Sequence, residues 1–151
     1  MILKKEKIYN SLLIIISLLI LIGCQPKKYE KNITNKEINT MEITINEKDY
    51  IIQLENNKTV ESLINLLPLD LDMNELNGNE KYIYLDSTLP TNPINPNHIN
   101  SGDVMLYGNN CLVIFYKSFD TTYSYTKIGH IDNLPTLDNK NIQVKLKTIS
   151  K

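Results

Sequence analysis

Six side chains in the second half of the sequence are of the types that ligand sites and acid–base catalysts use. They are Glu80, Tyr82, Tyr107, Tyr123, Tyr125 and His130. Tyrosine offers a large apolar ring with a polar hydroxyl, so the set predicts a site for a peptide or a small molecule. The alternative is catalysis by Glu80 and His130 as general acid and base, which requires both within hydrogen-bond reach of one substrate. The structural alternatives are a solvated strand start for Glu80 and core packing for the tyrosines.

Cys24 is the other residue with chemistry of its own, because an apolar run over residues 8–22 leads up to it. Three lysines precede that run: Lys4, Lys5 and Lys7. A positively charged N-terminal region, a short apolar segment and a small residue before the cleavage site are typical of a secretory signal peptide. With Leu21 and Gly23 in place, the end of the run resembles the lipobox of bacterial lipoproteins. The resemblance implies that signal peptide 1–23 is removed and that Cys24 is acylated.

An acylated Cys24 would hold the protein on a lipid bilayer at the cell envelope, facing away from the cytoplasm. The alternative, a membrane-spanning helix, requires about 20 apolar residues. The run over residues 8–23 is shorter and contains Asn10, Ser11 and Ser17. Because a single acyl chain binds membranes only marginally, the diacylglyceryl group of a lipoprotein is what would make the anchor stable.

The composition and charge of the chain limit the partners and cofactors that are expected. The chain has 151 residues, and removal of residues 1–23 takes away three lysines and one glutamate, which leaves 13 lysines, 16 acidic residues and a net charge of −3. This balance argues against a nucleic-acid partner, which would require a basic face. Cys111 would be left without a disulfide partner, and its apolar neighbours predict a small buried hydrophobic residue. No cofactor or metal site is expected, since His98 has no ligand partners at suitable spacing.

Residues 24–40 are polar and predict a flexible tether, and residues 41–151 predict one domain. Strands are expected where apolar residues alternate with polar ones or form short runs: 41–45, 50–54, 69–74, 80–86, 104–107, 111–117, 123–131 and 142–147. A helix is expected over about 59–67, from the spacing of Val60, Leu63 and Leu67, with a weaker helical turn at 134–137. Phe115 is expected to fill the interior of the barrel. Many short strands with turn signals predict an all-β barrel or sandwich.

Several short motifs, in order along the domain, resemble the small bacterial cyclophilin-like domain proteins. The motifs lie at residues 66–69, 79–82, 89–90, 102–104, 114–116 and 124–131. The resemblance implies a closed, mainly antiparallel eight-stranded barrel with one or two short helices. Cyclophilins proper are prolyl isomerases that rely on an arginine, whereas this chain has no arginine and no tryptophan. Lysine lacks the planar fork of donors and is a poor substitute.

These observations favour a non-catalytic ligand- or peptide-binding barrel anchored at the cell envelope. Two alternatives stay open. One is an enzyme, either isomerase-like or another acid–base catalyst that uses Glu80 and His130. The other is a structural subunit of an envelope complex, for which a broad apolar patch would be expected in place of a pocket.

Overall fold

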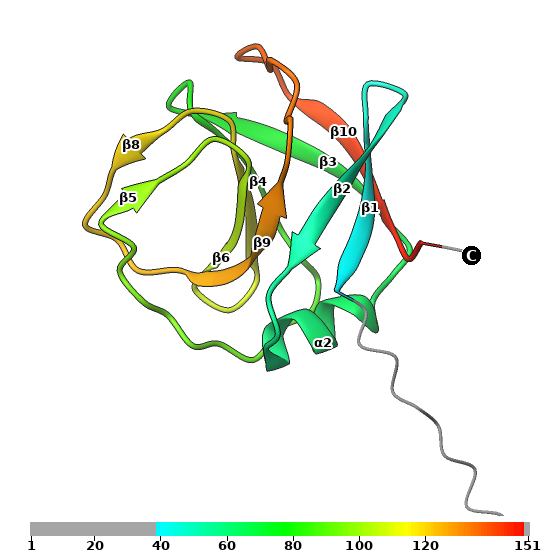
Figure 1. The fold of residues 1–151 in the computed structure, drawn as a ribbon, viewed down its shortest axis with the longest axis vertical. Coiled ribbons are helices and arrows are strands. Elements are labelled where there is room, and N and C mark those ends of the chain that lie inside the picture. Colours follow the sequence, from blue (N-terminus) through cyan, green and yellow to red (C-terminus); the bar gives the residue numbers. More distant parts are fainter. Residues whose placement is uncertain (1–38, 150–151) are drawn as a thin grey trace, which may run out of the picture. The chain divides into compact units, whose positions relative to one another are not determined.

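Ten strands and one helix are formed by residues 39–149, the part of the chain that the computed structural model describes. The elements are β1 (Thr40–Ile45), β2 (Lys48–Leu54), α2 (Lys58–Ile64), β3 (Leu69–Leu76), β4 (Glu80–Tyr84), β5 (His98–Ile99), β6 (Asp103–Tyr107), β7 (Cys111–Phe115), β8 (Phe119–Asp120), β9 (Thr126–Ile131) and β10 (Ile142–Lys147). Eight strands close into a barrel in the order β1-β10-β3-β4-β7-β6-β9-β2 (Figure 1), and every neighbouring pair is antiparallel. The prediction of a closed all-β barrel of eight strands is confirmed.

Three predictions from the N-terminal sequence lie outside the described residues. They are the signal peptide 1–23, the acylated Cys24 and nearly all of the tether 24–40. The first strand begins at Thr40, at the end of the predicted tether. Within residues 39–149, no helix is long and apolar enough to cross a bilayer.

The barrel interior is filled by apolar side chains that occupy every second position of the strands. Met41, Ile43 and Ile45 on β1 are fully buried, and Ile43 lies opposite the buried Leu146 of β10. Residues directly opposite each other in an antiparallel pair share a face, so both strands turn their apolar side inward. Full burial of one such side chain contributes about 1.5–3 kcal/mol. The β1–β2 turn is tighter than expected, because only Asn46 and Glu47 connect the strands, both in the left-handed region.

The helix α2 covers one end of the barrel. The Asn57 side chain caps it by accepting from the backbone N–H of Val60 (3.0 Å), and donates to the Lys127 carbonyl of β9 (2.8 Å). Val60 and Leu63 pack into the barrel core. The helix ends at Ile64, earlier than predicted, and the chain passes through a final non-helical turn to Pro68.

The helical turn predicted at 134–137 is wrong, since these residues have no regular secondary structure. The segment 132–141 instead lies across the barrel end opposite α2 (Figure 1) and buries Leu137 there. Its carbonyl groups at Asp138 and Lys140 are directed at a buried cation and accept hydrogen bonds from it. A helical turn is also disfavoured locally, because Pro135 restricts Leu134, the first residue of the predicted turn, away from the helical region.

That buried cation is the amine of Lys81, which points into the barrel from β4 and is fully buried. It forms an ion pair with Glu75 of β3 and lies 4.7 Å from the centre of the Tyr116 ring. The Tyr116 hydroxyl donates to the same Glu75 carboxylate (2.8 Å). A buried charge is tolerated only when it is paired and hydrogen-bonded, and this cluster meets both conditions.

A second, smaller core lies outside the barrel, between its wall and the ribbon of β5 and β8 (Figure 1). Phe115 belongs to this outer core, so the expectation that it fills the barrel itself is corrected. The reason is strand alternation: Leu112 and Ile114 of β7 point into the barrel, whereas Cys111, Val113 and Phe115 point out. β7 is buried on both faces, in keeping with its continuous run of apolar residues.

Candidate ligand pocket

The outer face of β4 carries the first three side chains of the site. Lys81 and Ile83 point inward, so Glu80, Tyr82 and Tyr84 all point outward from the barrel. The register with β7 fixes what lies beside them: Glu80 pairs with Phe115, Tyr82 with Val113 and Tyr84 with Cys111. Across β7, Cys111 also pairs with Tyr107 of β6. Three strands therefore place a carboxylate, aromatic rings and a small apolar floor on one surface.

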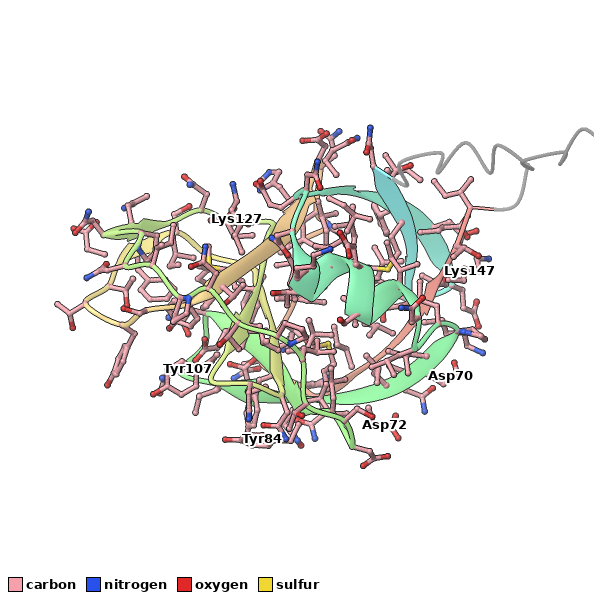
Figure 2. All side chains as sticks on the ribbon, turned by 90° about the horizontal axis from the view of Figure 1, so that it is seen from below. Asp70, Asp72, Tyr84, Tyr107, Lys127 and Lys147 are labelled. Carbon is pink, nitrogen blue, oxygen red and sulfur yellow. The ribbon has the colours of Figure 1, made fainter. Side chains whose placement is uncertain are left out.

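A pocket of about 310 Å³ opens on this surface. We call it the tyrosine pocket. Its lining consists of Leu76, Asn77, Glu80, Tyr82, Tyr84, Tyr107, Cys111, Val113, Tyr123 and Tyr125. Figure 2 shows two of these side chains, Tyr84 and Tyr107, close together on the outside of the barrel. The volume is at the lower end of the range for small-molecule sites, so the pocket suits one small group.

The loop that follows β8 supplies the two remaining rings, Tyr123 and Tyr125. Tyr125 is held in place by paired backbone hydrogen bonds with Ile94 (2.9 Å each) and by its ring, whose centre lies 5.5 Å from that of Phe115. It is 7% exposed, whereas Tyr123 is 62% exposed and Tyr107 is 43% exposed. The Tyr107 ring lies between these two, with ring centres 6.1 Å from Tyr123 and 5.6 Å from Tyr125. One wall is thus rigid and the rim is open to solvent.

Glu80 is the charged group of the pocket. Partial burial raises the pKa of its carboxyl above the ordinary value, and the negative charge of Glu75 raises it further. Glu75 behaves oppositely: burial favours a higher pKa, but hydrogen bonds from Lys81, Tyr116 and Gly78 outweigh it and the pKa of Glu75 is lowered. The Lys81 amine of β4 forms its ion pair with Glu75. Within residues 39–149, the Glu80 carboxylate forms no ion pair and has no counter-charge.

The Cys111 thiol and the Tyr125 hydroxyl at the pocket are neutral near pH 7. Burial, reinforced by the charge of Glu80, raises the pKa of the Cys111 thiol to about 11. This agrees with the prediction of an inert, buried cysteine, because the nucleophilic form of a thiol is its thiolate. Burial and the charge of Glu80 likewise raise the pKa of Tyr125. The tyrosine pocket therefore presents rings, a thiol and one carboxylate.

The structure brings together five of the six residues named from the sequence: Glu80, Tyr82, Tyr107, Tyr123 and Tyr125. His130 is the exception and is not part of the lining. It lies on β9 opposite Asp103, and its Nδ1 is 3.0 Å from the Asp103 carboxylate. The acid–base pair of Glu80 and His130 is therefore not assembled around this pocket.

Five lining residues were missed in the sequence: Leu76, Asn77, Tyr84, Cys111 and Val113. Tyr84 had a clear signal, because it continues the period-two spacing of Glu80 and Tyr82. Cys111 lies opposite Tyr107 in the β6–β7 hairpin, which brings it to the pocket. Asn77 lies in the turn just before β4. No group of three His, Cys, Asp or Glu residues within 39–149 is arranged to hold a metal ion.

The fold can be compared with known proteins. Residues 43–147, from β1 to the end of β10, match the Cyclophilin-like family. No curated protein matches the sequence. Among solved structures, the chain is similar to a hypothetical protein from Archaeoglobus fulgidus whose solution structure is known, with 16% sequence identity and a TM-score of 0.50. The alignment covers 74% of this chain and 96% of that protein, and at this identity it concerns the fold alone.

Proposed function

Because the chain belongs to the cyclophilin-like family, we propose that it is an envelope lipoprotein whose barrel binds a small molecule or a peptide in the tyrosine pocket, without catalysis. The observation that carries this proposal is the clustering of five tyrosines with one carboxylate around a single concavity. Three of those rings are exposed, Tyr84, Tyr107 and Tyr123, at a place where further burial would be favourable. Exposed aromatic groups around a concave surface are typical of sites that bind a ligand.

The proposal excludes prolyl isomerisation for a chemical reason. Fixed hydrogen-bond donors directed at the transition state usually make the largest single contribution to catalysis. Among residues 39–149, no cationic donor lines the tyrosine pocket, and the sequence has no arginine. The protonated thiol of Cys111 and the absence of His130 from the lining argue against nucleophilic and acid–base catalysis there.

The proposed membrane anchor rests on the sequence. The lysines before residue 8, the apolar run and the lipobox-like residues before Cys24 are together typical of a bacterial lipoprotein signal. Acylated Cys24 would hold the barrel at a bilayer outside the cytoplasm.

Nuclear magnetic resonance titration of the full-length protein tests the binding function. The probes are a proline-containing peptide and a mixture of small polar metabolites. We expect saturable shifts confined to amides of the tyrosine pocket, weakened in Tyr107→Leu and retained in Tyr107→Phe, which keeps the ring. Tyr107 is a suitable position because its side chain is 43% exposed and its loss leaves the core intact. Shifts spread over the far side of the barrel, or none at all, would contradict the proposal.

A further inference from the structure

We infer that the tyrosine pocket takes a small organic cation of the alkylammonium class. The inference rests on the proposed function, since it names the ligand class of the same pocket. Two features carry it: five tyrosine side chains line one concavity, and within the described residues 39–149 the only charged side chain of the lining is the carboxylate of Glu80.

The lining rings stand at steep angles to one another. The Tyr107 and Tyr123 rings meet at 89°, and the Tyr82 and Tyr84 rings meet at 83°. Rings set nearly at right angles present their faces in different directions around a shared space. The face of an aromatic ring is its negative side, and it attracts a cation within about 6 Å of the ring centre. Ring-lined cages of this kind recognise alkylated ammonium groups.

Glu80 supplies the charge that such a ligand would neutralise. Its carboxylate is partly buried against β7 and forms no ion pair within residues 39–149. Two lysines are close in sequence or space, and neither belongs to the lining of the pocket. Lys81 points into the barrel toward Glu75, and the Lys117 amine lies 5.7 Å from the Tyr116 ring centre and outside the lining. A cation in the pocket would therefore be the counter-charge of Glu80.

Other ligand classes fit less well. An anion would meet the negative charge of Glu80 and the negative faces of the rings, with no cationic side chain in the lining to offset either. A neutral apolar group would fill the space but would leave the carboxylate further desolvated and still unpaired. An alkylammonium ion combines the two requirements, because its methyl groups contact the rings and its charge faces Glu80. The volume of about 310 Å³ restricts it to a small ion or the end of a side chain.

The test compares choline with its neutral carbon isostere, in which a tert-butyl group replaces the trimethylammonium group. Full-length protein in maltoside micelles is titrated with each, and amide shifts at the tyrosine pocket are followed. We expect choline to bind at least about tenfold more tightly than the isostere. Equal affinity of the two compounds, or no saturable shift with choline, would overturn the inference.

Two pairs of variants assign the effect to its residues. Glu80→Gln keeps the shape and removes the charge, so it should weaken choline binding about tenfold, whereas binding of the isostere should not weaken. Glu61→Gln, an exposed position on α2, is the matched control and should change neither affinity. Tyr107→Leu should weaken choline binding about fivefold to thirtyfold, whereas Tyr107→Phe should stay within about twofold of the parent. Loss of binding in the Phe variant, or retention in the Leu variant, would contradict ring recognition.

Two further comparisons are needed. One distinguishes a lipid headgroup from a free cation, and the other distinguishes failure of the cation inference from failure of the proposed binding function. Adding phosphatidylcholine or phosphatidylglycerol to the micelles distinguishes a lipid headgroup from a free ion: choline-like shifts with phosphatidylcholine alone would identify a headgroup ligand. If the proline peptide binds in the tyrosine pocket and choline does not, the cation inference fails and the binding function stands. If no probe binds, both fail.

Discussion

Lys81 of β4 and Glu75 of β3 form an ion pair inside the barrel, where the Lys81 side chain is fully buried. The carbonyls of Asp138 and Lys140 accept from the same amine, each at 2.6 Å. One cation thus ties together two barrel strands and the segment that lies across the barrel end. Because Glu75 takes this cation, Glu80 on the outer face is left without one. The pair inside the barrel therefore shapes the electrostatics of the pocket outside it.

Replacing Lys81 with Met should destabilise the protein by about 3–5 kcal/mol, because the Glu75 carboxylate, on a side chain only 15% exposed, would be left without its counter-charge. Urea unfolding followed by circular dichroism measures the loss. The control is Lys145→Met, whose partner Asp70 points outward in Figure 2 and lies 3.4 Å away in an exposed pair. Breaking that pair should cost less than about 1 kcal/mol. Similar losses in the two variants would contradict the role of the buried pair.

Glu75→Gln should destabilise the protein at neutral pH, and its deficit should shrink in acid. The pKa of Glu75 is lowered in the folded state, so its carboxylate stabilises the fold above the ordinary value of 4.5. That contribution is lost as the pH falls below 4.5 and through the lower folded-state pKa. Unfolding free energies of the parent and the variant should therefore converge on the acid side. A constant difference across the range would show that the pKa of Glu75 is not lowered.

Glu80→Gln should have the opposite effect and stabilise the protein at neutral pH. Burial and the charge of Glu75 raise the pKa of Glu80 above 4.5, so its ionised form is disfavoured in the folded state. The penalty is present above the folded-state pKa and disappears as the pH falls below 4.5, so the gain from Gln should vanish there. Thermal melts at a series of pH values measure it. A variant less stable than the parent at pH 7 would indicate that Glu80 has a favourable partner.

The protein should show no significant prolyl isomerase turnover. Loss of one donor directed at the transition state typically lowers the rate by about 10²–10³, and this chain has no arginine to supply one. A protease-coupled assay on a proline peptide, with an authentic cyclophilin beside it, measures the rate. A rate near that of the cyclophilin, abolished in Tyr125→Phe or Glu80→Gln, would reveal a different catalytic arrangement in the tyrosine pocket.

Cys24→Ser should release the protein from membranes or leave it as an uncleaved precursor. The thiol of Cys24 is the atom that acylation requires, and serine has no thiol. Metabolic labelling with a fatty acid, followed by membrane fractionation, measures the effect. Cys111→Ser is the control, because Cys111 is buried in the barrel wall and should not affect labelling. Equal labelling of the parent and Cys24→Ser would disprove the anchor.

Local sequence patterns predict much of the fold. The alternation in β1, β3 and β10 and the helical spacing of Val60 and Leu63 are confirmed, because each depends only on residues a few positions apart. The same alternation places Glu80 and Tyr82, two of the ten residues that line the tyrosine pocket, on one face of β4. The resemblance in motif order was enough to predict the closed barrel.

Tertiary structure decided the rest, because strand neighbours far apart in sequence leave no local signal. The register of β4 against β7 and of β7 against β6 joins Glu80 and Tyr107, which periodicity alone cannot do. The path of β9 carries His130 to Asp103 and away from the pocket. Sequence alone determined the apolar faces of β1, β3 and β10. Only the closed barrel, with the β5–β8 ribbon packed against it, decided that Phe115 lies in an outer core and that Lys81 is buried against Glu75.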